Sequence, residues 1–147
     1  MGITRLRLRF PSPALILSCL ALFAALGGGA YAATSSGTSG IHFTNATLQN
    51  SWQSGHKMNP IDAPPGYVKD SVGVVHLRGD IFGGSNDTTA FVLPKGLRPS
   101  HVVYTPIYTA SGALGYVLIQ PNGKVIPFDG NVGAFASLDG VSFAAGE

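Results

Sequence analysis

Between residues 66 and 145 the sequence alternates apolar and polar residues with a period of two, and turn-forming residues interrupt it about every ten positions. A period of two places successive side chains on opposite faces of a β-strand. The interruptions are rich in Gly and Pro and include Asn-Gly and Asp-Gly pairs, which favour tight turns. After residue 33, apolar residues do not recur at i, i+3, i+4 and i+7 over three turns. The pattern therefore excludes a helical domain and predicts an antiparallel β-domain.

The clearest predicted strand covers residues 74–81. Val75, Leu77 and Ile81 fall on one face of this strand, and the residues between them, including Asp80, fall on a solvated face. A turn cluster at residues 83–87 leads into a second strand at residues 88–93.

Four further strands are predicted at residues 101–109, 112–120, 124–128 and 134–144. Pro106 places the first of them at an edge or a bulge, because proline cannot donate a ladder hydrogen bond. The Asn122-Gly123 pair predicts a hairpin between the second and the third. In the last strand the apolar residues change parity across Asp139-Gly140, which predicts a β-bulge.

About seven short strands in some eighty residues predict a small antiparallel β-sandwich or jelly-roll-like domain. The only cysteine, Cys19, lies in the N-terminal apolar segment, so no internal disulfide can support this domain. A domain of this size buries only about 60–65% of its unfolded surface, and uncovered strand edges promote aggregation. We therefore expect another copy of the chain to cover these edges in a closed symmetric oligomer.

The N-terminal segment, residues 1–33, has the organisation of an export signal. Arg5, Arg7 and Arg9 precede thirteen apolar residues, which as a helix span about 20 Å, less than the ~30 Å hydrocarbon core. Small residues at Ala30 and Ala32 fit a signal-peptidase site. We predict a cleaved signal helix and a secreted or cell-surface protein. The alternative is an uncleaved membrane anchor. Residues 34–65 are predicted to be a linker and an irregular segment, and residues 66–147 the β-sandwich head.

Net charge argues against nucleic acid as a partner. The whole chain has nine Lys and Arg residues against seven Asp and Glu. Three of the nine precede the apolar segment, so its removal leaves six basic residues and a slightly negative chain. Nucleic-acid-binding domains need a basic surface.

The series of short motifs between residues 66 and 145 resembles the C-terminal head domain of phage tail-fibre and minor structural proteins. The motifs are Gly66-Tyr-Val-Lys-Asp70, Gly73-Val-Val-His-Leu-Arg-Gly79, Gly83-Gly84, Phe91-Val-Leu-Pro-Lys-Gly-Leu-Arg-Pro99, Asn122-Gly-Lys-Val125 and Ser137-Leu-Asp-Gly-Val-Ser-Phe143. The leader before them resembles actinobacterial export segments. The head resemblance implies a small antiparallel β-domain that forms a homotrimer at a fibre tip and acts as a binding or trimer-locking head. Leu97 departs from the family pattern, which has tyrosine before the arginine.

Aromatic residues are the main candidates for a ligand site. Sugar sites stack pyranose rings on exposed Tyr or Trp, and Tyr104 and Tyr108 fall on one side of a predicted strand, flanking Pro106. Trp52 is a third candidate ring, and Arg78 is a candidate for recognising an anionic glycan. The alternatives are packing of the rings in the core or in a subunit interface, and pairing of Arg78 with an acid of another subunit.

Residues for catalysis or metal binding do not form a recognisable group. A glycosidase needs two acids, one with a raised pKa; the candidates are Asp80, Asp87, Asp129 and Asp139, of which three lie in turn sequences. The four histidines lack metal-ligand spacing. His76 is the one metal candidate, because three copies near a trimer axis would supply three ligands. We predict no cofactor and no enzymatic activity.

Together these observations predict an exported, non-enzymatic, oligomerising β head that acts in surface recognition or adhesion. Its expected partners are further copies of itself and a surface glycan or receptor. One alternative is a purely structural trimerisation cap without a ligand. The other is a small extracellular hydrolase.

Overall fold

The computed structural model describes residues 41–146, and within them the chain is all-β, as predicted. The helical segments of this part are two single turns of 3-10 helix, η1 (Gly55–Lys57) and η2 (Ala110–Gly112). None of the helices in residues 41–146 is long and apolar enough to cross a membrane. The predicted signal segment, residues 1–33, lies outside the described residues.

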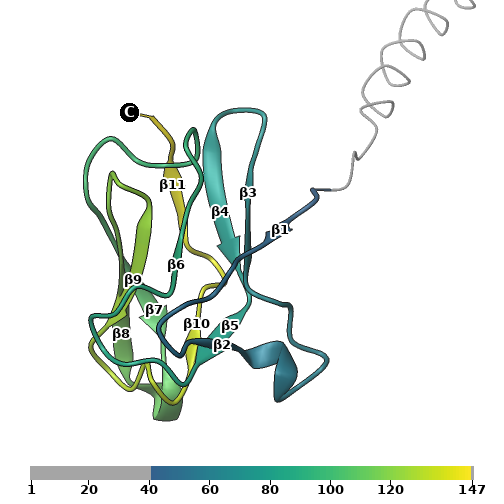
Figure 1. Cartoon of the computed structure of the whole chain (residues 1–147), viewed down its shortest axis with the longest axis vertical. Helices are drawn as coiled ribbons and strands as arrows, with labels where there is room; N and C mark the ends of the chain where they lie inside the picture. Colours follow the sequence, from purple (N-terminus) through teal and green to yellow (C-terminus); the bar gives the residue numbers. More distant parts are fainter. Residues whose placement is uncertain (1–40, 147) are drawn as a thin grey trace, which may run out of the picture. The chain divides into compact units, whose positions relative to one another are not determined.

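Within residues 41–146, eleven strands form three antiparallel sheets (Figure 1). The first sheet has the order β1 (Thr44–Asn45), β3 (Gly66–Lys69), β4 (Val74–Arg78) and β11 (Ser142–Ala144). The second has the order β10 (Ala136–Ser137), β5 (Asp80–Phe82) and β2 (Gln53–Ser54). The third has the order β6 (Phe91–Val92), β9 (Lys124–Phe128), β8 (Leu114–Ile119) and β7 (Val103–Tyr108). The domain thus has three small sheets, whereas a sandwich has two.

One hydrophobic core joins the three sheets. Val75 from β4, Ile81 from β5 and Val117 from β8 are each fully buried in it. Each buried side chain of this kind contributes about 1.5–3 kcal/mol on leaving water. Since the chain has a single cysteine, this shared core stabilises the domain without a disulfide.

The hairpin of β8 and β9 and the edge position of β7 confirm the sequence analysis. At the Asn122-Gly123 turn, the Gly123 N–H donates to the Gln120 carbonyl oxygen at 2.8 Å. β7 pairs with β8 alone, so Pro106 lies on an edge strand, where its missing donor costs little. The strand predicted at residues 88–93 is shorter: only β6 forms, and it pairs with β9.

The strand predicted at residues 74–81 is in fact two strands of different sheets. Gly79 separates β4 from β5 and has a φ of +82°, a conformation that other residues rarely adopt. A Cβ atom at this position would lie 2.5 Å from the Ala63 carbonyl oxygen and 2.7 Å from Pro64. The expectation that Asp80 faces solvent is wrong, because the bend at Gly79 leaves this residue only 7% exposed.

The chain changes sheet a second time at residues 138–141. The predicted bulge at Asp139-Gly140 is instead a turn, closed by the Val141 N–H, which donates to the Leu138 carbonyl oxygen at 3.2 Å. β10, before the turn, pairs with β5, and β11, after it, pairs with β4. The parity change read from the sequence is real, since Leu138, Val141 and Phe143 are all buried, but a turn produces it.

The two changes of sheet are hydrogen-bonded to each other. The Gly79 N–H donates to Oδ1 of Asp139 at 2.8 Å, and the Leu138 N–H donates to the Gly79 carbonyl oxygen at 2.8 Å. We call this group of three residues the sheet junction. It holds β4 and β5 against the turn that leads from β10 to β11.

The compact unit begins at Ile41, well before the boundary at residue 66 that the sequence analysis placed. β1 pairs with β3, and β2 pairs with β5. Trp52, which precedes β2, is 4% exposed, and its indole N–H bonds Oγ1 of Thr88 at 3.0 Å. The segment lacked a period-two pattern because its strands are only two residues long.

Replacing Gly79 by alanine tests the sheet junction. We expect Gly79→Ala to lower the free energy of unfolding by more than about 2 kcal/mol, because the left-handed conformation and the clash with Ala63 and Pro64 both oppose a Cβ atom. Urea unfolding of residues 34–147, which contain the whole compact unit, measures this loss.

Gly96→Ala is the matched control. Gly96 has a φ of +86°, and a Cβ atom there would have no neighbour within 4 Å. Gly96→Ala should therefore lower the free energy of unfolding only by the cost of the left-handed conformation, about 1–2 kcal/mol. Equal losses in the two variants would contradict the role of the sheet junction.

Candidate functional site

The outward side of the β6-β9-β8-β7 sheet is covered by aromatic and aliphatic side chains. The charged side chain on this side of the sheet is Lys124, at the start of β9. We call the remaining large side chains of β7, β8 and β9 on this side the apolar face: Tyr104, Pro106, Tyr108, Leu114, Tyr116, Leu118, Ile126 and Phe128. The opposite side of these strands is buried in the core and is apolar for that reason. Since the outward side is apolar as well, these strands are apolar on both sides.

Strand register arranges the apolar face in rows that run across the sheet. Tyr104 pairs with Leu118, and Leu118 with Ile126. In the next row Pro106 pairs with Tyr116, and Tyr116 with Phe128. The third row, at the end of the β7–β8 hairpin, consists of Tyr108 and Leu114.

Phe128 orders the aromatic rings at the centre of this face. Its ring stacks on Tyr116 with centroids 5.5 Å apart, and the Tyr104 ring meets it edge-on at 6.2 Å. Such ring pairs contribute about 0.5–1.5 kcal/mol beyond their buried area. The face is therefore a preorganised surface, although Tyr104 remains 66% exposed.

The outward side of the sheet that contains β4 has a different character. β4 presents His76 and Arg78 there, and Ser142 of β11 pairs with His76. Polar side chains on a solvated sheet face are the usual arrangement. The apolar face is thus a local property of the β7-β8-β9 surface and does not extend to this other solvated sheet face.

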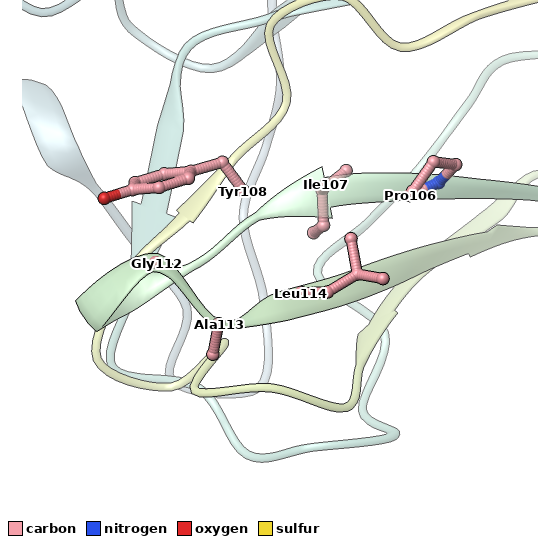
Figure 2. Close-up of a pocket in the computed structure, with 6 residues that line it drawn as sticks. All are labelled: Pro106, Ile107, Tyr108, Gly112, Ala113 and Leu114. Atoms are coloured by element: carbon pink, nitrogen blue, oxygen red, sulfur yellow. The ribbon is translucent and has the colours of Figure 1, made fainter.

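A shallow hollow of about 310 Å³ lies at the free end of the β7–β8 hairpin (Figure 2). Pro106, Ile107 and Tyr108 line it from β7, and residues 112–114 line it from η2 and β8. The Tyr108 ring is 61% exposed and meets the Phe135 ring edge-on, with centroids 6.0 Å apart. An exposed ring beside an apolar hollow is the geometry on which a planar or ring-shaped ligand can stack.

Of the predicted ligand residues, Tyr104 and Tyr108 do lie together on the apolar face, and the other two lie elsewhere. Trp52 is in the core, so its ring has no free face for a sugar in this structure. Arg78 belongs to a different sheet, and its guanidinium carbon lies 4.4 Å from the centroid of the Phe43 ring. We therefore leave Trp52 and Arg78 out of the candidate site.

His76, the candidate metal ligand, is bonded to a carboxylate. Its Nε2 lies 3.0 Å from Oδ2 of Asp70, and since a carboxylate can only accept, Nε2 donates. This hydrogen bond lowers the pKa of Asp70; desolvation opposes the shift, and the N–H groups of Val74 and Val72 add to it. Among residues 41–146 no three His, Cys, Asp or Glu side chains form a metal-binding group.

Two of the four carboxylates considered for a hydrolase, those of Asp80 and Asp139, lie at or beside the sheet junction, whereas Asp87 and Asp129 are exposed. Burial raises the pKa of Asp80, and the charges of Asp139 and Asp62 act in the same direction, while a hydrogen bond from Ser137 opposes them. A raised pKa is a feature of general acids. Asp80 is, however, only 7% exposed. Asp139 already accepts a hydrogen bond from the Gly79 N–H within the sheet junction.

Sequence reasoning found two rings of the apolar face and missed the rest of it. The signal was present, since residues 114–119 are apolar at both even and odd positions. A strand that is apolar on both sides is covered on both sides or carries an exposed surface. Phe128 and Ile126 could not be assigned to this surface without the pairing of β9 with β8.

No protein-family model matches the chain, and no curated protein matches its sequence. Its fold does have a counterpart among solved structures: the crystal structure of the receptor binding protein (gp15) of Listeria phage PSA. The TM-score is 0.59 at 18% sequence identity, over 89% of this chain and 79% of that chain. The domain shares the fold of this phage protein. The sequence resemblance to phage fibre heads is thereby supported at the level of the fold.

Asp80→Asn tests the raised pKa of the buried Asp80 carboxyl group. A carboxyl group whose pKa is raised by folding stabilises the native state below its unfolded pKa and loses that contribution as the pH rises through its folded pKa. The free energy of unfolding of Asp80→Asn, relative to the unchanged chain, should therefore increase between about pH 3 and pH 7. Urea unfolding at several pH values measures it.

Asp70→Asn should show the opposite trend and serves as the control. The lowered pKa of Asp70 stabilises the native state above its unfolded pKa, so this variant should lose stability relative to the unchanged chain as the pH rises. Parallel pH profiles for the two variants would contradict the assignment.

Proposed function

We propose that the chain is an exported, non-enzymatic head domain for surface recognition or adhesion, which acts as a homo-oligomer. The exposed Tyr108 ring beside the hollow at the end of the β7–β8 hairpin is the observation that carries this proposal. The fold shared with a phage receptor binding protein supports it. A surface glycan is the ligand class that best fits a stacking ring at a shallow, open site.

The hairpin end also offers polar groups that could orient a sugar. Exposed Ser111 forms part of η2, and exposed Asp129 begins the turn after β9. The N–H of Asn131, in the same turn, donates to Oγ1 of Thr109 at 3.1 Å, which fixes the turn against the hairpin. Ring stacking supplies affinity at such a site, and hydrogen bonds at its margin supply specificity.

The structural trimerisation cap remains the second candidate function. The apolar face favours it, because a surface of this composition suits contact between protein subunits. The two candidates share the oligomer and differ in the ligand, so a binding measurement separates them.

Substituting Tyr108 tests the ligand site. We expect Tyr108→Ala to weaken binding to a glycan identified on an array of bacterial surface polysaccharides by about tenfold, because it removes the stacking ring. Tyr108→Phe should keep most of the affinity. Surface plasmon resonance measures both.

Ile61→Ala is the control, because Ile61 is 89% exposed in the loop after η1. Light scattering on the same samples reports the oligomer. If no glycan binds while the oligomer persists, the structural cap replaces the recognition head. If Tyr108→Ala binds as tightly as the unchanged chain, the site lies elsewhere.

A further inference from the structure

The apolar face is comparable in size to the largest exposed apolar patch of a typical soluble monomer, and such a patch is often functional. Tyr104 and Tyr108 are 66% and 61% exposed, which for two aromatic side chains leaves on the order of 250 Å² uncovered. Leu114 is 60% exposed, and Pro106 and the partly exposed remaining side chains bring the total to on the order of 500 Å². Size alone does not distinguish this patch from the largest patch of other soluble proteins, so its chemistry and its arrangement have to indicate the partner.

The central rows of the apolar face have the wrong chemistry for a sugar. A sugar site places hydrogen-bond donors and acceptors around its ring contacts. Each of the two rows offers a single hydroxyl group, that of Tyr104 in the first row and that of Tyr116 in the second. These two rows therefore fit an apolar partner surface, and a ligand is better placed at the Tyr108 end of the sheet.

A second copy of the same face meets these requirements. A charged patch repels its own copy, whereas an uncharged apolar patch is compatible with itself. The charged side chain of this sheet side, Lys124, lies beside Val92 of β6 at its border. Two copies that cover the whole patch, with the central rows at the middle of the contact and the row of Tyr108 and Leu114 at its margin, would bury on the order of 1,000 Å² in total, the lower bound for a specific interface.

We propose that the two central rows of the apolar face, centred on Leu118 and Tyr116, are the surface through which copies of this chain associate. The inference rests on the oligomeric part of the proposed function and assigns a surface to it. Tyr104 and Phe128 form the aromatic part of the contact. The row of Tyr108 and Leu114 lies at its margin, next to the hollow.

Single lysine substitutions test this surface. Tyr104→Lys puts a charge on an edge strand at a position that is already two-thirds exposed, so the fold should tolerate it. Leu118→Lys puts a charge at the centre of the two central rows. We expect each to weaken self-association at least tenfold, because the interface would have to bury an unpaired charge. Sedimentation of residues 34–147 over a concentration range gives the association constants.

Ile61→Lys is the matched control, since it adds the same charge at a loop position that is 89% exposed. Circular dichroism shows whether each variant is folded. Weakened association in a folded Tyr104→Lys chain, with Ile61→Lys unchanged, supports the proposal. An unchanged chain that is monomeric at about 100 μM overturns it. So does a folded Tyr104→Lys chain that associates as tightly as the unchanged one.

The same samples separate this inference from the recognition function. A chain that binds its glycan but is monomeric contradicts the association surface and the oligomeric part of the proposed function, and leaves the recognition role in place. A chain that associates through this surface but binds no glycan contradicts the recognition head alone. In a folded, monomeric Tyr104→Lys chain, binding of a single glycan at the Tyr108 end should persist within about threefold.

Discussion

The sheet junction is the contact on which the rest of the domain depends. Two separate stretches of chain leave one sheet and enter another at this point, and the bonds between Gly79, Leu138 and Asp139 hold them together. Without a disulfide, the orientation of the sheets rests on these bonds and on the core that they share. The residue type at position 79 is set by the backbone, because a side chain would collide with residues 63 and 64.

Local sequence patterns predicted the regular parts of the fold well. Alternation located β8 and β9, the Asn122-Gly123 pair located their hairpin, and Pro106 located the edge strand. The errors fall where a strand changes sheet. Alternation continues through Gly79, so the period-two pattern does not show the bend, and the glycine itself is the one local sign of it. The burial of Asp80 depends on this bend. The short strands before residue 66 could not be predicted for a related reason. They are strands because they pair with β3 and β5, and their own sequence has no period-two pattern.

The candidate site was predictable in part. Two tyrosines with the same parity on one strand identified the side of the sheet that matters. The extent of the surface depends on which strands are neighbours, and that is decided by the pairing of β9 with β8. Trp52 illustrates the opposite error, because a lone tryptophan in an irregular segment gave no indication that its indole N–H would bond Thr88 inside the core. Aromatic residues serve cores, interfaces and ligands alike, and only burial and neighbours distinguish these uses.

The position of β11 in the first sheet also constrains when the domain can form. β4 lies in the first half of the described chain, yet its partner on one side is made of residues 142–144. The Asp139 carboxylate, which accepts a hydrogen bond from the Gly79 N–H, is sixty residues away from Gly79 in sequence. During synthesis, β4 and β5 therefore keep an unpaired edge and an incomplete core until β10 and β11, residues 136–144, have left the ribosome. The native domain can form only after these residues are available, so a nascent chain that ends before β11 exposes its unpaired strand edge to chaperones and proteases.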